Sequence, residues 1–63
     1  MKNEEYVLAL YDFVSKNSEE LTIQRNEKLK VLDWNFKEDW IYGSKTSDPE
    51  KRGIFPKLFV RRI

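Results

Sequence analysis

Short alternating runs of hydrophobic and polar residues dominate the sequence, and no long window repeats apolar residues at helical spacing. Tyr6 to Tyr11 is a nearly continuous apolar run. Leu21-Thr22-Ile23 and Leu29-Lys30-Val31 both alternate, which places every second side chain on the same face of a strand. Because β-branched and aromatic residues are also frequent, the pattern predicts short strands rather than helices.

The second half of the chain continues this pattern. Trp40-Ile41-Tyr42-Gly43 is predicted to be a strand, and so is Gly53-Ile54-Phe55, which ends at Pro56 because proline donates no hydrogen bond to a neighbouring strand. Phe59-Val60-Arg61 closes the chain. The polar segments between strands are predicted to be loops or turns: residues 15–20, 24–27, 35–39 and 44–52. Five or six short strands are typical of a small all-β barrel or sandwich.

The alternation also predicts which side chains form the core and which turn residue is special. Asn26 is expected to adopt the left-handed conformation, which asparagine tolerates at modest cost. Gly43 is expected to pack close to the core. The predicted core residues are Val7, Ala9, Leu21, Ile23, Leu29, Val31, Phe55 and Val60.

Composition limits the chemistry that the chain can perform. Its 63 residues make one domain at most, and they include no cysteine and no histidine. Disulfides, thiolate metal sites and histidine acid–base catalysis are therefore excluded. The adjacent acids Glu19-Glu20 and Glu38-Asp39 fall on predicted loops, where no apolar pocket would raise a carboxyl pKa. We therefore expect no enzyme and no cofactor.

The charge balance and the hydropathy of the chain argue against two further classes of partner, nucleic acids and membranes. Twelve Lys and Arg residues oppose eleven Asp and Glu residues, so the basic field of a dedicated nucleic-acid binder is missing. No apolar run approaches the ~20 residues of a membrane span, and residues 1–5 do not resemble a signal peptide. We expect a monomeric cytoplasmic module, with residues 1–5 as an N-terminal extension and residues 6–62 as the domain.

Aromatic residues make up 14% of the chain, more than so small a core can bury, and several of them fall in motifs that resemble the Src homology 3 (SH3) family. Ala9-Leu10-Tyr11-Asp12-Phe13 resembles the opening ALYDY motif. Glu19-Glu20-Leu21-Thr22-Ile23 resembles the acidic end of the RT loop and the strand after it. Trp40 stands where the family keeps a ligand-facing tryptophan, and Gly53 to Val60 resembles the closing motif.

The resemblance implies a five-stranded SH3-like barrel of two packed antiparallel sheets, with a short helical turn after Pro56. It also implies a shallow groove that binds proline-rich (PxxP) segments in the polyproline II conformation, flanked by a basic residue. Aromatic residues would line two dipeptide pockets, and acidic residues would face a third. The implied ligand-binding residues are Tyr11, Phe13, Glu19, Glu20, Asp39, Trp40, Pro56, Leu58 and Phe59.

Some residues depart from the family pattern. Phe13 and Phe59 each replace a usual tyrosine, Leu58 replaces a frequent asparagine, and Ile41 replaces the second tryptophan of a common pair. The groove therefore loses polar contacts. Because SH3 domains that bind ubiquitin tend to carry phenylalanine at the position of Phe59, ubiquitin is the alternative ligand.

Three further alternatives stay open at this stage. Trp34 and Phe36 either fold back over the edge of the barrel or extend the third pocket with an apolar wall. A nucleic-acid-binding barrel would also expose aromatic rings, but Glu19, Glu20 and Asp39 would then repel phosphates. The aromatic residues could instead belong to the core, although alternation places Phe59 outward if Val60 points inward.

Overall fold

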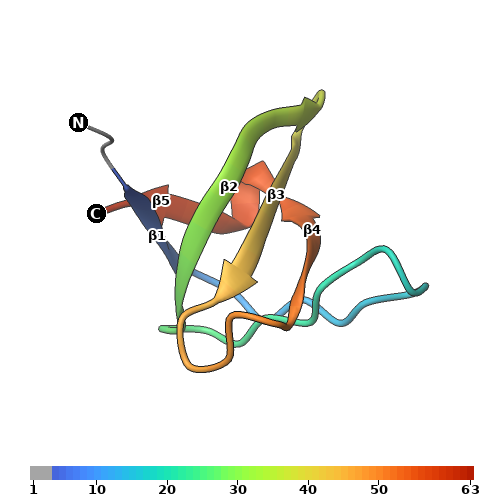
Figure 1. The fold of residues 1–63 in the computed structure, drawn as a ribbon, viewed down its shortest axis with the longest axis horizontal. Coiled ribbons are helices and arrows are strands. Elements are labelled where there is room, and N and C mark those ends of the chain that lie inside the picture. The colour runs from blue at the N-terminus through green and yellow to red at the C-terminus, as the bar shows by residue number, and fades with distance from the viewer. Residues whose placement is uncertain (1–3) are drawn as a thin grey trace.

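The structure, a computed structural model, describes residues 4–63. All five strands pair antiparallel in the order β4-β3-β2-β1-β5. Figure 1 shows the elements in chain order: β1 (Glu5–Ala9), β2 (Lys28–Lys37), β3 (Trp40–Lys45), β4 (Arg52–Pro56), the 3-10 turn η1 (Lys57–Phe59) and β5 (Val60–Arg62). The expected all-β fold of five strands, with a short helical turn after Pro56, is confirmed.

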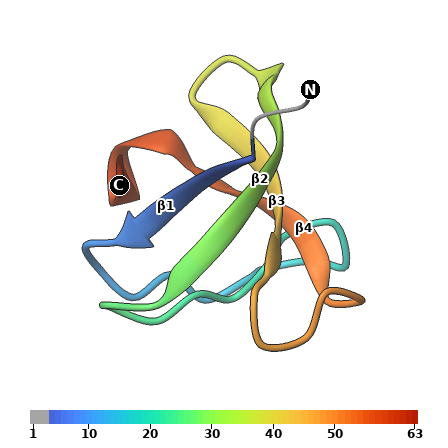
Figure 2. The same cartoon turned by 60° about the vertical axis from the view of Figure 1, so that its left-hand side comes forward.

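The strands form one continuous hydrogen-bonded sheet rather than the two packed sheets that we expected. Strand β2 is the reason, because its ten residues pair with β1 on one side and with β3 on the other. Its register against β3 is irregular between Val31 and Asp33 and again between Asp33 and Lys37. Such irregularities bend a strand, and the sheet curls round into a barrel (Figure 2).

The predicted loop at residues 35–39 is wrong, because β2 runs on to Lys37 and pairs there with Trp40. Only Glu38 and Asp39 remain as a turn, and Asp39 has a φ of 68°. Aspartate tolerates this left-handed conformation better than most residues. The residues around Phe36 are mostly polar because the side chains of this part of β2 are mostly exposed, and the sequence pattern therefore indicated a loop.

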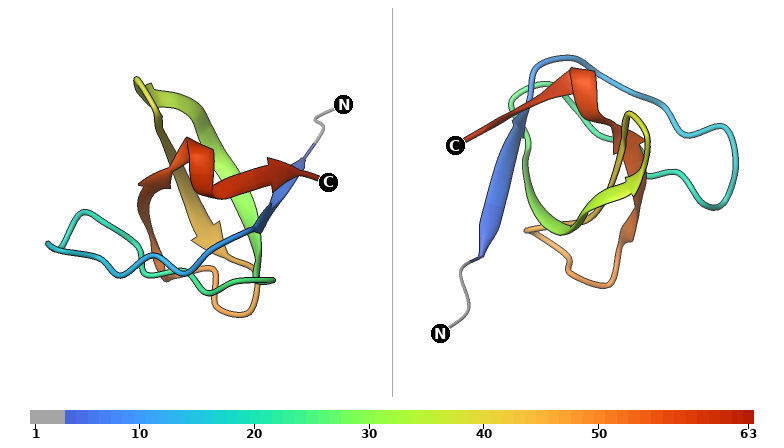
Figure 3. Two further views of the ribbon diagram at one scale, coloured as in Figure 1. Left: turned by 180° about the vertical axis from the view of Figure 1, so that it is seen from behind. Right: turned by 90° about the horizontal axis from the view of Figure 1, so that it is seen from above.

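Two other predicted strands are shorter than expected. The strand predicted over Tyr6 to Tyr11 begins at Glu5 and ends at Ala9. Residues 21–23 form no ladder. Isolated bridges of Phe13 with Ile23 and of Glu20 with Ile54 hold this segment, together with the core packing of Leu21 and Ile23. These residues belong to the RT loop, residues 10–27, which projects from the barrel (Figures 1 and 3).

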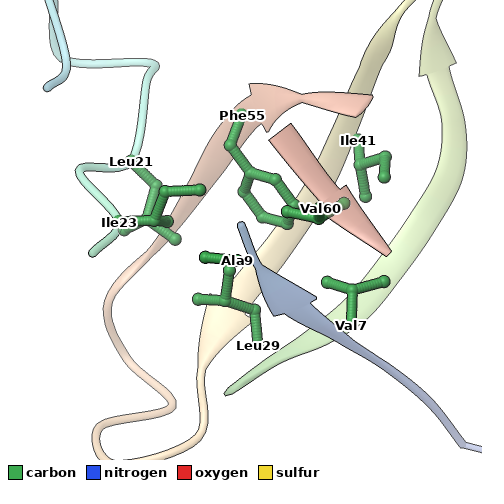
Figure 4. Packing of buried hydrophobic residues seen from close by; sticks show 8 residues of the cluster. All are labelled: Val7, Ala9, Leu21, Ile23, Leu29, Ile41, Phe55 and Val60. Atoms are coloured by element: carbon green, nitrogen blue, oxygen red, sulfur yellow. The ribbon is translucent and has the colours of Figure 1, made fainter. Parts of the chain in front are cut away.

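The core fills the inside of the curled sheet (Figure 4). Seven of the eight predicted core residues are buried, and Val31 is only half-buried against the cluster. Ile41 is fully buried, a position that the sequence reasoning had not assigned to the core. The core cluster comprises Val7, Ala9, Leu21, Ile23, Leu29, Ile41, Phe55 and Val60.

Two backbone predictions are confirmed. Asn26 has a φ of 74°, in the left-handed region. A Cβ on Gly43 would lie 2.5 Å from the Lys30 carbonyl oxygen and 2.9 Å from Cε2 of Phe55. Only glycine therefore lets β3 lie this close to both β2 and the central ring of the core.

Residues 1–3 of the expected N-terminal extension lie outside the described residues. Glu5, at its end, already belongs to β1 and pairs with Val31. At the other end of the chain, Ile63 follows β5 and donates a backbone hydrogen bond to the Tyr6 carbonyl. Within residues 4–63, no helix has the length and apolar character needed to cross a membrane.

Candidate functional site

Four aromatic rings form a continuous row on the surface. Tyr11 meets Phe59 edge-to-face at a centroid distance of 5.5 Å, and Phe59 meets Phe13 at 6.0 Å. Phe13 in turn meets Trp40 at 5.9 Å. Tyr11 is 57% exposed, and the other three rings are half-buried. We call these four residues, together with Pro56, the aromatic row.

Backbone hydrogen bonds of the RT loop bring the first half of the aromatic row together. The Leu10 amide donates to the Phe59 carbonyl at 2.7 Å, which sets Tyr11 beside η1. Phe13 and Ile23 exchange two backbone hydrogen bonds of 2.9 Å. Because Ile23 is anchored in the core, this bridge fixes the base of the loop and the position of Phe13 on it.

The pairing of β3 with β4 positions the second half of the aromatic row, Trp40 and Pro56. Trp40 lies opposite Pro56 in the ladder, and Ile41, the next residue, is fully buried. Since side chains alternate along a strand, Trp40 faces outward. The Lys57 amide donates to the Asp39 carbonyl at 2.8 Å, which ties η1 to the β2–β3 turn.

The acidic residues predicted for the third pocket differ in whether their side chains are already hydrogen-bonded. Oε1 of Glu20 accepts a hydrogen bond of 2.7 Å from the Lys16 amide, and Oε2 lies 3.4 Å from the side-chain nitrogen of Asn17. Glu20 thus holds the tip of the RT loop together. The Glu19 side chain is exposed and makes no such contact within residues 4–63, and Asp39 is exposed in the β2–β3 turn.

The remaining predicted residue, Leu58, lies on η1 and is 78% exposed. It therefore presents an apolar side chain to solvent beside Phe59, where a polar asparagine is frequent in the resembling family. Together with Tyr11, it makes this end of the row apolar and open.

A hollow of about 300 Å³ lies beside the RT loop, and we call it the Phe36 hollow. Sequence reasoning missed Tyr42, Ile54 and Arg52 here, although the alternation from Trp40 to Tyr42 could have shown that both face outward. The lining residues are Ser18, Glu19, Phe36, Tyr42, Arg52, Gly53 and Ile54.

Trp34 and Phe36 take different roles. Trp34 packs against the core cluster, and two cations lie near its ring, with Nζ of Lys57 at 5.6 Å and Cζ of Arg62 at 4.4 Å from its centroid. Phe36 stacks at 5.8 Å from the Tyr42 ring and lines the hollow. Trp34 therefore covers the edge of the barrel. Of the two residues, only Phe36 is placed where it can form an apolar wall beside the RT loop.

A larger hollow of about 380 Å³ lies on the sheet next to Tyr6 and Lys30. None of the predicted site residues lines it, so size alone does not identify the ligand surface. The aromatic row combines flat, rigid rings with nearby carboxylates, which suits an extended apolar chain that carries a positive charge.

Comparison with known proteins agrees with this architecture. The family model of the SH3 domain matches residues 8–57. Curated relatives include LAS seventeen-binding protein 1 of Saccharomyces cerevisiae (38% identity, 92% of this chain, 22% of the relative) and human amphiphysin (35% identity, 90% of this chain, 10% of the relative). The chain thus spans less than a quarter of the length of either relative.

Solved structures with the same fold include SH3 domains at moderate sequence identity. The C-terminal SH3 domain of myosin IB from Entamoeba histolytica, bound to a peptide of EhFP10(GEF), has a TM-score of 0.84 at 27% identity and covers 100% of this chain and 98% of its own. The SH3 domain of yeast NBP2 reaches 0.86 at 27% identity and covers 94% and 97%. The chain belongs to the SH3 domain family, whose members are protein-interaction modules and are generally non-catalytic.

Proposed function

We propose that this SH3 domain binds proline-rich segments of other proteins in the polyproline II conformation and so recruits partners as an adaptor. The observation that carries the proposal is the aromatic row, four rings in edge-to-face contact that stay open to solvent beside an acidic loop. A proline-rich chain already populates the extended conformation, so it loses little entropy when it docks on such a surface.

The rings are expected to supply most of the binding free energy. Tyr11 and Phe59 would hold one proline-containing dipeptide of the ligand. Phe13, Trp40 and Pro56 would hold the next. A small preformed groove and a short peptide give a dissociation constant on the order of micromolar, equivalent to about −8 kcal/mol.

The acidic residues are expected to set the orientation of the ligand. A lysine or arginine beside the PxxP core would pair with Glu19 or Asp39, both exposed. An exposed ion pair contributes ~0.2–1 kcal/mol, and a bidentate arginine–carboxylate pair about 1.5–3 kcal/mol. The domain should therefore prefer ligands with arginine over ligands with a neutral residue next to the core, whether this residue stands before or after the PxxP segment.

Fluorescence polarisation with a labelled core peptide, Pro-Pro-Leu-Pro-Pro-Arg, tests the proposal directly. We expect micromolar affinity, and about tenfold weaker binding when both prolines of the PxxP pair are replaced by alanine. An array of proline-rich peptides, with arginine before or after the core, would then identify the preferred sequence. Equal affinity for the peptide with both substitutions would overturn the proposal.

Ubiquitin is the second candidate ligand, and the exposed apolar end of the aromatic row favours it. Phe59 has no hydroxyl, and Leu58 and Tyr11 beside it are 78% and 57% exposed. This end would suit a hydrophobic patch on a folded protein. Titration of isotope-labelled domain with ubiquitin should shift the resonances around Phe59, and an unchanged spectrum would exclude this ligand.

The proposed setting is the cytoplasm, with the domain acting as a monomer. The near balance of charges gives no strong field toward nucleic acid or membrane surfaces. Fractionation of a tagged parent protein and sedimentation of the isolated domain would test the two statements separately.

A further inference from the structure

The larger hollow, of about 380 Å³, lies on the outer face of the sheet and has no part in the proposed function. A row of paired residues crosses four strands beneath it. Tyr6 of β1 lies opposite Lys30 of β2, which lies opposite Ser44 of β3. Ser44 in turn lies opposite Arg52 of β4. Residues that pair directly across antiparallel strands share one face of the sheet, and all four line this hollow. We call it the basic hollow, and its lining comprises Tyr6, Lys30, Leu32, Ser44, Lys45, Thr46, Pro49 and Arg52.

Ser44 forms the floor of the basic hollow. A Cβ on its neighbour Gly43 would point at the Phe55 ring in the core, so Ser44 points to the opposite face of β3. Ser44 is only 3% exposed, and its small side chain leaves space between Lys30 and Arg52. Since neighbouring strands lie ~4.8 Å apart, the backbones that carry these two cations are separated by about 10 Å.

The basic hollow is separate from the aromatic row. Trp40, Tyr42 and Ser44 are every second residue of β3 and therefore share its outer face. At ~3.4 Å per residue, the four steps from Trp40 to Ser44 place the basic hollow about 14 Å further along the strand. No residue of the aromatic row lines it. One ligand on the aromatic row and another in the basic hollow can therefore be bound at the same time.

Two of the cations that line the basic hollow can bind a ligand. Arg52 is exposed and makes no ion pair in the described part of the chain. Lys30 lies 3.6 Å from Glu4 in an exposed pair, and such pairs are weak. Lys45 is neutralised, because its Nζ contacts the two carboxylate oxygens of Glu27 at 3.0 and 2.9 Å. None of the described lining residues is an aspartate or glutamate, so the hollow favours a negatively charged ligand.

The chain's own Glu4 shows how a carboxylate fits at one end of the basic hollow. Its Oε1 accepts a hydrogen bond of 2.6 Å from the Tyr6 hydroxyl, and its Oε2 lies 3.6 Å from Nζ of Lys30. Both of these partners line the hollow. Because Glu4 is exposed and precedes β1, a ligand carboxylate can take its place.

Apolar surface lies beside the two cations. Leu32 is 42% exposed and lines the basic hollow, as do Pro49 and Tyr6. A ligand side chain that covers this surface removes it from water, which is favourable in proportion to the area covered. A small inorganic anion would leave it uncovered, whereas a peptide can supply both charge and apolar contact.

We infer that the basic hollow is a second binding site, which takes an acidic segment of a partner protein with apolar side chains between its acidic residues. One carboxylate pairs with Lys30 in place of Glu4, an apolar side chain covers Leu32, and another carboxylate pairs with Arg52. Carboxylates on separate residues suit two cations that stand two strands apart. The domain then holds two partners at once, and the inference does not depend on which ligand occupies the aromatic row.

A nuclear magnetic resonance titration of isotope-labelled domain with the peptide Ser-Asp-Glu-Leu-Phe-Asp-Glu-Ser tests the inference. We expect saturable shifts at the amides of Lys30, Ser44 and Arg52, no shift of the Trp40 indole N–H, and a dissociation constant on the order of 100 µM. A peptide of equal charge, with serine in place of leucine and phenylalanine, should bind at least about fivefold more weakly. No shifts in the basic hollow, or equal affinity of the two peptides, would overturn the inference.

Two cations of β2 provide a matched pair of substitutions. Lys30→Gln should weaken binding of the acidic peptide about two- to fivefold, and the loss should shrink at high salt. Lys37→Gln removes an exposed charge at the other end of the strand, where Lys37 pairs with Trp40, and should have little effect. Lys30 is preferred to Arg52 for this test because Arg52 also lines the Phe36 hollow. Equal losses in the two variants would mean unspecific attraction and would overturn the inference.

Substitution of Glu4 should have the opposite sign. Glu4→Gln removes the carboxylate that competes for Lys30, so the acidic peptide should bind about two- to fivefold tighter. Glu5→Gln makes the same change in net charge, but Glu5 precedes Tyr6 in β1 and points to the other face of the sheet. It should leave the affinity nearly unchanged. Thermal melts verify folding, and an equal gain in both variants, or no gain in Glu4→Gln, would contradict the assigned site.

The inference and the proposed function fail in different ways. Saturation with the core peptide Pro-Pro-Leu-Pro-Pro-Arg should leave the affinity for the acidic peptide unchanged, and displacement would overturn the inference while the proposed function stands. If the acidic peptide binds but the core peptide does not, the proposed function alone is overturned. Tighter binding of a single-stranded oligonucleotide, or a dimer that Lys30→Gln dissociates, would assign the basic hollow to another occupant and overturn the inference.

Discussion

The rings of Phe13 and Trp40 meet edge-to-face at a centroid distance of 5.9 Å and an interplanar angle of 70°. This contact joins the RT loop to the start of β3, two segments that are far apart in the chain and share no ladder. The position of Trp40 on the surface therefore depends on the RT loop as well as on its own strand. Substitutions in the RT loop and in β3 should therefore both affect ligand binding at this contact.

The two tryptophans offer a matched pair of substitutions. Trp40→Ala removes an outward-facing ring, so we expect at least about 30-fold weaker peptide binding, as for a binding hot spot. The free energy of unfolding should fall by only about 1 kcal/mol, the value of one aromatic pair. Calorimetry and a thermal melt measure both effects.

Trp34→Ala is the control. Its ring packs against the core and contacts Lys57 and Arg62, so the loss should lower the unfolding free energy by roughly 2–3 kcal/mol. Peptide affinity of the folded fraction should change little. The assignment of roles would be reversed if Trp40→Ala unfolded the domain and Trp34→Ala abolished binding.

The two adjacent acids of the RT loop should respond differently to neutralisation. Glu19→Gln should weaken binding of an arginine-containing peptide about two- to fivefold, and the loss should shrink at high salt, as for an exposed ion pair. Glu20→Gln should also speed hydrogen exchange at the Lys16 amide, because its carboxylate accepts that hydrogen bond. Exchange at Lys16 should not change in Glu19→Gln, and equal exchange in the two variants would contradict the assigned roles.

Gly43→Ala should destabilise the barrel without touching the ligand surface. The new methyl group would lie 2.5 Å from the Lys30 carbonyl, and relieving this contact should cost about 1–3 kcal/mol or more. Chemical denaturation measures the loss. Leu32→Ala, at an exposed position of β2, serves as the control and should change stability by less than about 1 kcal/mol.

Phe59→Tyr should separate the two proposed ligands. A hydroxyl on this ring restores a donor toward the backbone of a proline-rich peptide, so affinity for the peptide should stay equal or rise by up to about tenfold. The same hydroxyl would be desolvated against a hydrophobic patch of ubiquitin and should weaken that complex. Parallel titrations with the peptide and with ubiquitin give the comparison. Weaker peptide binding together with tighter ubiquitin binding by the variant would contradict this expectation.

Alternation and burial made most of the fold predictable from the sequence. Strands such as Leu29-Lys30-Val31 show clear alternation. Gly43 lies two residues after the buried Ile41, on the same face of β3. The extension of β2 to Lys37 was not predictable, because its final residues are largely polar and exposed. There, pairing with β3 outweighs the composition of the strand itself.

The residues of the site were predictable from the sequence, but several of their contacts were not. The motifs indicated the residues of the aromatic row, and the structure brings Tyr11, Phe13, Trp40 and Phe59 into contact. The hydrogen bonds that occupy Glu20 depend on the conformation of the RT loop, which the sequence pattern does not specify. Trp34 and Phe36 lie where the register of β2 against β3 is irregular, so simple alternation does not specify that Trp34 packs against the core while Phe36 lines the hollow.

The most direct test of the central claim is a titration of isotope-labelled domain with the core peptide, followed by nuclear magnetic resonance. The account predicts that the largest shifts fall on Tyr11, Phe13, Trp40 and Phe59, including the indole N–H of Trp40 but not that of Trp34. Saturable shifts confined to other residues, or no shifts at millimolar peptide, would contradict it.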